Sequence, residues 1–398
     1  MNKKILLLAL LTYCLIFKSY AQIDAPTVQE YLGGSIPTSV PFLTIAPDAR
    51  AGALGDIGVA SSPDANSQHW NAAKYAFIED QSGVSLTYSP WLRGLVSDMN
   101  LLYLSGYYRL NERSTFAGSL RFFTLGEIIF RQDPSEPGYI IRPNEYAVDL
   151  SYSNKLTDNF SVAVAGRFIR SDLTKGYSYG TGSSSKAAQS VAADVAMFYQ
   201  KDIELDALQS SSLALGLNIS NIGAKLSYSE SARKDFLPTT LRFGGAFTAE
   251  LDKFNKLTAY LEISKLLVPT PPYMSGDTII AGYDPDVGTI TGMVQSFYDA
   301  PDGFKEELTE YIWSLGAEYL YSNVLAFRGG YLHDAKGSKQ YATVGLGLKF
   351  NVVTLDLSYL MPTGKVTTHP LKNTLRISVK FSFSEYRAQH PVTPNPIN

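Results

Sequence analysis

The sequence predicts an all-β protein, a fourteen-stranded antiparallel transmembrane β-barrel with an N-terminal plug, or hatch. Three observations predict this fold. Bulky apolar residues alternate with small or polar ones along many segments, these segments are even in number and long enough to cross a bilayer, and the connections between them are alternately short and long. The composition agrees, because 45% of the 398 residues are hydrophobic and only 18% are charged, with 26 tyrosines and 20 phenylalanines.

The same numbers disfavour other classes of protein. The chain has too much apolar material for intrinsic disorder. Its longest apolar run, residues 5–17, is shorter than the roughly 18 residues that a membrane-spanning helix needs. A formal net charge of −3 argues against nucleic acid as a partner.

Residues 1–21 are expected to be a secretory signal peptide. Lys3 and Lys4 precede the apolar run, and Ser19 and Ala21 supply the small residues that a cleavage site requires. The alternative is a lipoprotein anchor on Cys14, for which the bulky Tyr13 is an unsuitable neighbour. Cys14 is the only cysteine, so the mature chain should be exported and folded without disulfides.

Residues 22–82 are expected to form the plug. This segment is rich in Pro, Gly, Ala and Asp and lacks the alternation of a strand. The wall side chains of a fourteen-stranded barrel are too short to fill its lumen, so the lumen must hold water, ligand or a plug. A separate soluble domain is disfavoured because the segment has too little apolar material for a core of its own.

Residues 83–383 carry the strand pattern. In the last segment, for example, Leu375, Ile377 and Val379 alternate with polar residues, which gives one face suited to hydrocarbon. A lysine at Leu355 or Val379 should therefore destabilise the barrel far more than one at Thr354 or Ser378. The fourteen predicted strands are 83–90, 98–110, 113–125, 145–156, 159–171, 188–200, 211–222, 239–250, 256–266, 310–321, 323–333, 339–350, 352–361 and 373–383.

The connections predict which rim faces the periplasm. Those after the even-numbered strands are short, and most of those after the odd-numbered strands are long, as in outer-membrane barrels whose short turns are periplasmic. Tyrosines near the strand ends are interpreted as interfacial girdles. They are Tyr319 and Tyr321 at the short-turn rim and Tyr331, Tyr341 and Tyr359 at the other.

Charged residues on the predicted inner face have two interpretations. They could line a polar channel, or they could hydrogen-bond a plug in a closed lumen, which we favour. The set comprises Arg121, Glu145, Asp149, Arg167, Asp194, Arg242, Glu318 and Asp356.

The connection at 267–309 is the longest, and loops of this length are commonly functional or disordered. Its apolar content favours a packed structure, acting either as a lid over the barrel mouth or as a contact surface for a partner. The candidate partner-binding residues are Met293, Phe297, Tyr298 and Phe304, followed by Trp91 and Leu92 in the first outer loop, because aromatic residues and Met are enriched at interfaces.

No catalytic, cofactor or metal site is predicted, and the chain is not expected to be an enzyme. The four histidines have no metal-binding spacing, and the sequence contains neither a nucleophile elbow nor a phosphate loop. Asp284 and Asp286 are interpreted as part of a solvated turn rather than a calcium site. Residues 384–398 should form an extended periplasmic tail.

Three stretches of the plug carry a resemblance to a known family. They are residues 42–52 (FLTIAPDARAG), 55–60 (GDIGVA) and 62–71 (SPDANSQHWN), the last of which contains the plug motif Asn66, His69, Trp70 and Asn71. Together with residues 89–92 and 103–108, they resemble the PorV family of FadL-like outer-membrane barrels. FadL-like plugs often contain an Asn-Pro-Ala turn. Here positions 71–73 read Asn-Ala-Ala, so this turn should be less constrained.

The resemblance implies a function that composition and periodicity do not. It implies a component of the type IX secretion system in the outer membrane of a Gram-negative cell, surrounded by outer-membrane lipid. The implied partners are the translocon barrel protein, the C-terminal domains of secreted cargo, and the sortase-type surface-attachment machinery. The alternative is a FadL-type transporter that passes hydrophobic small molecules through a kinked strand and the plug.

Overall fold

The computed structural model describes residues 35–93, 96, 98–130, 138–176, 186–205, 208–229, 234–363 and 371–383. The predicted signal peptide, the start of the predicted plug at 22–34 and the predicted tail lie outside these residues. Among the described residues, no helix is both long enough and apolar enough to span a membrane.

Fourteen antiparallel strands form a closed barrel, which confirms the predicted fold class. Every predicted segment corresponds to one strand, and its ends fall within two residues of the observed ones. The strands are β1 (Ser82–Pro90), β2 (Asn100–Arg109), β3 (Ser114–Thr124), β6 (Asn144–Lys155), β7 (Phe160–Asp172), β8 (Ala188–Asp202), β9 (Ser210–Gly223), β10 (Thr240–Glu250), β11 (Asn255–Leu266), β14 (Tyr311–Tyr321), β15 (Leu325–Asp334), β16 (Lys339–Phe350), β17 (Val353–Pro362) and β18 (Leu375–Ser382).

The alternation in the sequence separates the two faces of the wall. On β6, Leu150 is 71% exposed, whereas the flanking Asp149 and Ser151 are buried against the contents of the lumen. On β17, Leu355 is exposed and Asp356 is fully buried. The barrel therefore turns an apolar surface outward and a polar surface inward, as a bilayer requires.

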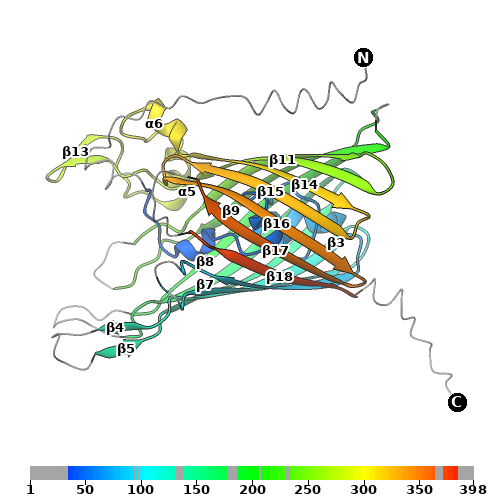
Figure 1. The fold of residues 1–398 in the computed structure, drawn as a ribbon. Coiled ribbons are helices and arrows are strands. Elements are labelled where there is room, and N and C mark those ends of the chain that lie inside the picture. The colour runs from blue at the N-terminus through cyan, green and yellow to red at the C-terminus, as the bar shows by residue number, and fades with distance from the viewer. Residues whose placement is uncertain are drawn as a thin grey trace.

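The two rims differ as predicted. Short turns join the strands at one rim, and Ser322 and Asn323 in the β14–β15 turn both adopt the left-handed conformation of a tight hairpin. At the other rim, Figure 1 shows two projecting structures. One is the small hairpin of β4 (Ile128–Phe130) and β5 (Tyr139–Ile141).

The second projecting structure, called here the mouth extension, comprises residues 267–310. It contains the hairpin of β12 (Tyr273–Ser275) and β13 (Thr278–Ala281), followed by α5 (Thr289–Gln295) and α6 (Phe304–Thr309). The prediction of a packed structure at 267–309 is thus confirmed.

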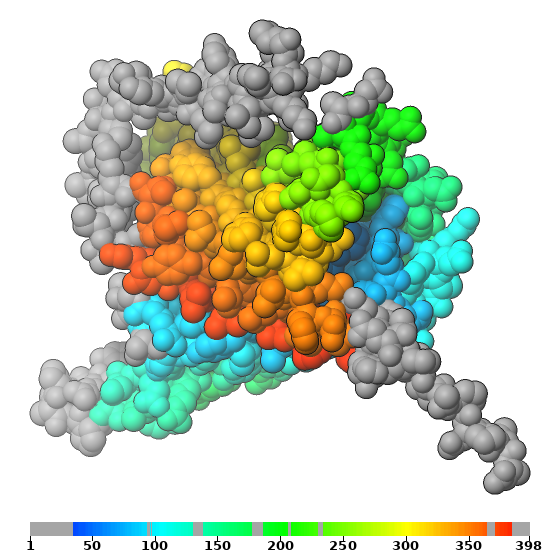
Figure 2. Space-filling model, turned by 45° about the vertical axis from the view of Figure 1, so that its right-hand side comes forward, coloured from blue at the N-terminus to red at the C-terminus, as the bar shows by residue number. Residues whose placement is uncertain are grey.

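The segment before β1 lies inside the barrel, where Figure 1 shows its blue helices surrounded by strands. It contains η2 (Pro41–Thr44), α3 (Ala49–Gly52), α4 (Ser67–Trp70) and η3 (Ala72–Phe77). Figure 2 shows the same blue segment between the strand ends at the short-turn rim. Its apolar residues pack on the wall, as Phe42 and Leu43 do against Phe123 and Ile169.

Glycines on the inner wall let this segment approach closely. They lie on β9, β10, β14, β15 and β16 and face residues 53–59: Gly216, Gly244, Gly316, Gly330 and Gly345. A Cβ on Gly330 would lie 2.0 Å from the carbonyl carbon of Leu54, and one on Gly216 would lie 2.1 Å from the carbonyl oxygen of Val59. The wall is therefore shaped to the plug backbone.

The girdle prediction is wrong for one tyrosine, Tyr341. Tyr341 points into the lumen, is 4% exposed and donates a hydrogen bond to Asp56 Oδ2 at 2.5 Å. The reason is the register of β16, in which Tyr341 shares the inner face with Thr343 and Gly345. Tyr331 and Tyr359 do face outward.

Candidate functional site

Hydrogen bonds from several strands hold the plug in the lumen. Glu262 of β11 accepts two backbone N–H groups, those of Gly58 and Val59, both at 2.9 Å. On β14, the carboxylate of Glu318 accepts hydrogen bonds from Arg50 Nη2 at 3.0 Å and Nε at 3.2 Å. Charge-assisted, bidentate contacts of this kind are strong and geometrically specific.

The opposite wall holds the plug in the same way. Arg121 of β3 donates to the carbonyl oxygens of Phe42 and Leu43, the latter at 2.8 Å. Lys380 of β18 lies 3.3 Å from Asp64 of the plug and 2.8 Å from Asp356 of the wall. These contacts support the favoured interpretation, in which inner-face charges hydrogen-bond a plug.

The rest of the predicted inner-face set also lies where the alternation placed it. Arg167 of β7 pairs with Asp149 and with Asp194, and Glu145 accepts a hydrogen bond from Ser171. Arg242 faces inward as well and lies 3.3 Å from Glu262.

The plug motif is buried and hydrogen-bonded. Trp70 Nε1 donates to Asp48 at 2.6 Å, His69 Nδ1 lies 2.7 Å from Arg121, and Asn66 accepts from Ser105. The Asn71 side chain accepts from the N–H of Ala73 and donates to two carbonyl oxygens, those of Val59 and Met197. Asn71 thus supplies by hydrogen bonds much of the constraint expected to be missing without a proline.

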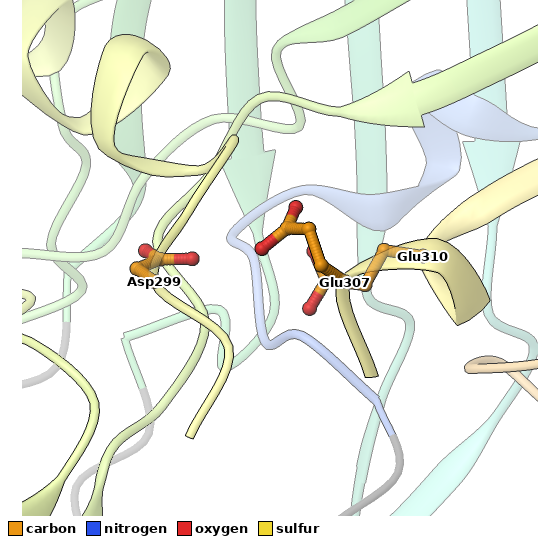
Figure 3. A group of neighbouring side chains, drawn as sticks. All are labelled: Asp299, Glu307 and Glu310. Carbon is orange, nitrogen blue, oxygen red and sulfur yellow. The ribbon is translucent and has the colours of Figure 1, made fainter. Parts of the chain in front are cut away.

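At the long-loop rim, three carboxylates of the mouth extension meet. Figure 3 shows Asp299, Glu307 and Glu310 converging, and their oxygens lie within 4.8 Å of one another. Lys265 Nζ, at the end of β11, lies 2.7 Å from Glu307 Oε1 and 2.6 Å from Glu310 Oε2. The Lys265 ammonium thus occupies the place that a metal ion bound by both glutamates would need.

Thr270 completes this cluster, called here the carboxylate latch. Its hydroxyl donates to Glu310 at 2.7 Å, and its N–H donates to Asp299 Oδ2 at 3.0 Å. Burial, reinforced by Glu310 and Glu307, raises the pKa of Asp299 to about 6. The latch holds α6, and the segment before it that contains Asp299, against the end of β11 at the rim of the barrel.

The predicted partner-binding residues fall into two groups. Phe297, Tyr298 and Phe304 are exposed on the mouth extension, Phe304 by 75%, while Met293 in α5 is half-buried. Trp91 and Leu92 are half-buried beyond β1, and Trp91 packs against the cluster that contains Phe42. The structure therefore does not bring the two groups together as one surface.

Sequence reasoning missed the residues of the carboxylate latch. Lys265 lies 42 residues from Glu307 along the chain, and no motif or periodicity links them. The only available signal was charge on the inner face near a strand end. The sequence predicts a turn at Asp284, and Asp284 accepts a hydrogen bond from the Asp286 N–H at 2.8 Å, as such a turn requires.

A closed fourteen-strand barrel with an apolar outside and a plugged lumen defines a class, the plugged barrels of the bacterial outer membrane. Within that class, the family described as "Type IX secretion system protein PorV" matches residues 29–273, which is more than half of the chain. The chain belongs to this family. It is accordingly a multi-pass outer-membrane component of the type IX secretion system.

Solved structures similar to this chain include three outer-membrane barrels. The toluene transporter TbuX of Ralstonia pickettii is 12% identical, covers 84% of this chain and 98% of its own, and has a TM-score of 0.45. The toluene transporter TodX of Pseudomonas putida is 10% identical, and the match covers 84% of this chain and 95% of TodX with a TM-score of 0.46. A FadL homologue of Pseudomonas aeruginosa is 11% identical, and the match covers 88% of this chain and 100% of the homologue with a TM-score of 0.42. No curated protein matches the sequence.

Proposed function

We propose that this barrel is a docking component, which binds the translocon barrel protein and the C-terminal domains of secreted cargo at its outer rim. It would then pass the cargo to the sortase-type surface-attachment machinery. The family supports a role in type IX secretion, and the partners and the transfer step are our proposal. The observation that carries it is the exposed apolar face of the mouth extension.

This apolar face consists of Ile290, Val294, Phe297, Tyr298 and Phe304, which are 64%, 58%, 42%, 56% and 75% exposed. Ile290, Val294 and Phe297 follow helical spacing, so they lie on one side of α5 and its continuation. The opposite side packs on the barrel mouth, where Thr289 donates to the carbonyl oxygen of Gly223. The extension therefore covers the mouth and also presents a surface to a partner.

The surface is held in a fixed arrangement. The rings of Tyr298 and Tyr283 meet edge to face with centroids 5.5 Å apart, and Lys265 Nζ lies 6.0 Å from the centre of the Phe297 ring. Apolar side chains held in place before binding lose less conformational entropy when a partner arrives. This supports an anchor role for Phe297 and Tyr298.

The alternative, transport of hydrophobic small molecules, lacks a comparable observation. That alternative requires a kinked strand that opens the barrel wall. In the described barrel, a register shift occurs between β8 and β9, near Val195. Asn221 lies at this shift and is hydrogen-bonded, because its N–H donates to Asp194 and its side chain donates to the carbonyl oxygen of Pro238.

The proposal is tested by replacing Ile290, Val294 and Phe297 together with serine. These side chains are exposed, so the barrel should still fold. We expect co-purification with the translocon and cargo, measured by mild-detergent pull-down from native membranes and mass spectrometry, to fall strongly. Truncating a few well-packed interface anchors typically removes most of the binding energy. Deletion of 276–301 is a less clean variant, since it also removes Asp299 from the latch.

A matched control replaces Ile129 and Ile140 with serine. They are the exposed apolar residues of the β4–β5 hairpin, 52% and 53% exposed at the same rim. Co-purification should survive this change. If the mouth-extension variant retains the complex and secretes normally, the extension is a lid and the docking proposal is wrong about its surface.

A further inference from the structure

A pocket of about 270 Å³, lined by both polar and apolar side chains, lies between the plug and the barrel wall. Its plug side includes Asp56 and Trp70, and its wall side includes Arg242 of β10, Ser264 of β11 and Ser314 of β14. Lys336 and Lys339, at the outer β15–β16 turn, also line it, so the pocket opens toward the long-loop rim. We call it the vestibule pocket.

Arg242 is held in place at the inner end of this pocket. Its Nη1 donates to Glu262 Oε1 at 3.3 Å, and its guanidinium lies 5.0 Å from the centre of the Trp70 ring. Glu262 is itself fixed by the two plug N–H groups of Gly58 and Val59. The Arg242 side chain is only 11% exposed. Both neighbours thus hold the guanidinium in one orientation.

The other donors of Arg242 remain available. In the described part of the chain, no further hydrogen bond to a protein acceptor accompanies the one to Glu262. A guanidinium carries five N–H donors in a planar fork that suits a carboxylate. Ser264 and Ser314 add two hydroxyls to the same wall, on the strands next to Arg242 and Glu262.

The acidic residues of the pocket are already paired, so they do not cancel this donor set. Each carboxylate has a cation beside it: Asp56 lies 3.6 Å from Arg376 and Glu310 lies 2.6 Å from Lys265. Lys339 lies 3.9 Å from Asp334, and its side chain is 54% exposed at the mouth. Lys339 offsets Asp334, so the cation inside the pocket with donors left, among the described residues, is Arg242.

We propose that the vestibule pocket binds a carboxylate, delivered from the outer side either as the side chain or chain end of a polypeptide or as a small organic acid. The volume suits a group of this size and is below the about 300–1,000 Å³ of typical ligand pockets. Arg242 would receive the carboxylate, with Trp70 against the guanidinium and Ser264 and Ser314 beside it. This binding site is independent of the docking surface on the mouth extension.

Trp70 offers a direct readout. The sequence contains three tryptophans, and replacing Trp91 and Trp313 with phenylalanine leaves Trp70 as the single tryptophan, which can be excited selectively over the tyrosines. The probes are the peptide acetyl-Gly-Gly-Glu-amide, its neutral isostere acetyl-Gly-Gly-Gln-amide, acetyl-Gly-Gly-Gly with a free carboxyl end, and 4-carbamoylbutanoate. We expect saturable fluorescence changes with carboxylate probes and none with the glutamine peptide. The order of affinities then distinguishes side chain, chain end and small acid.

Arg242→Gln should weaken carboxylate binding by about 10- to 100-fold, the range for one lost charge-assisted hydrogen-bonding group. Arg242→Lys keeps the charge but loses the planar pair of donors, so its affinity for the carboxylate should lie between those of the parent and of Arg242→Gln. Because Arg242 also orients Glu262, a Ser264→Ala, Ser314→Ala variant provides a second test, since neither hydroxyl bonds the plug in the described contacts. This double variant should also weaken binding while leaving the folded, heat-modifiable barrel intact.

The matched control is Lys253→Gln, which removes one positive charge at the opposite rim, in the turn between β10 and β11. It should leave binding unchanged. The proposal is overturned if the glutamine peptide binds as well as the glutamate peptide, if Arg242→Gln binds like the parent, or if no carboxylate probe gives a saturable change.

Discussion

At the scale of single residues, Asp299 shows how burial in the carboxylate latch affects the mouth extension. The groups that face it are Glu307 and Glu310 of α6 and its end, Lys265 of β11, and Thr270, with Lys336 3.7 Å from Glu310. Oδ1 of Asp299 has no hydrogen-bond partner among the described residues. Its charge at neutral pH is therefore poorly compensated.

The first prediction follows from the pKa of about 6 at Asp299, which is above the usual value near 3.9 for an aspartate. A raised carboxyl pKa means that the folded extension binds a proton more tightly than the unfolded one. The contribution of Asp299 to its stability should be fully present below pH 4 and be lost as the pH rises through 6. We expect a loss of about 1–2 kcal/mol, allowing for solvent screening.

Asp299→Asn should remove this pH dependence. The amide oxygen can still accept from Thr270, and its N–H₂ group can donate to Glu307 or Glu310. At pH 7.5, limited proteolysis within 267–310 should be slower in the variant than in the parent, and at pH 4.5 the two should be similar. A parent whose cleavage rate does not change between pH 4.5 and 8 would contradict the assignment.

At the scale of elements, the strands could be predicted and the contacts of the plug could not. Strand positions follow from alternation, which is a local property of residues such as 375–380. Where the plug lies on the wall depends on close contacts such as Gly330 to Leu54, which join parts of the chain far apart in sequence. The girdle prediction for Tyr341 was wrong for a related reason, because a position near a strand end does not determine which face of the wall a tyrosine occupies.

The candidate site divides along the same line. Phe297, Tyr298 and Phe304 could be predicted as candidates because apolar residues in a long connection are unusual wherever they fold, and the structure shows that they are exposed. Arg242 was identified as an inner-face charge, but its stacking on Trp70 could not be, since that contact requires the plug to be placed first. Contacts between a plug residue and a wall residue therefore cannot be predicted from the pattern of a single segment.

The second prediction concerns the fit of the plug. Gly330→Ala places a Cβ 2.0 Å from the backbone of Leu54, whereas at the neighbouring Gly329 the nearest atom is 3.9 Å away. We expect Gly330→Ala to cost about 1–3 kcal/mol by overpacking and to expose residues 53–59. Gly329→Ala should be close to neutral. The measurement is amide hydrogen exchange of the plug in detergent micelles. Equal exchange in both variants would show that the plug is not tightly fitted.

At the scale of the whole molecule, closure determines how the barrel responds to its surroundings. β1 pairs with β18 through six residue pairs, from Gly83 with Ser382 to Tyr88 with Ile377, so no strand edge remains open in the barrel. The outer surface then faces hydrocarbon, where backbone groups must be satisfied within the sheet. The structure also revises one expectation, because Ser378 is fully buried and accepts a hydrogen bond from the Ala49 N–H, so a lysine there would displace the plug.

The last prediction uses the bilayer as the solvent. Leu150 lies near the middle of β6 and is 71% exposed, so Leu150→Lys should cost about 2–4 kcal/mol, as expected near the midplane. Leu355 is the third residue of β17, closer to the short-turn rim, so Leu355→Lys should cost less. Thr354→Lys, on the inner side at that depth, should cost least, because water at the rim screens its repulsion from Lys349 and Lys380. Urea titration of refolding into lipid vesicles, with the folded fraction read from the heat-modifiable band on unboiled gels, measures all three. The outward assignment of Leu150 fails if Leu150→Lys is no more destabilising than Thr354→Lys.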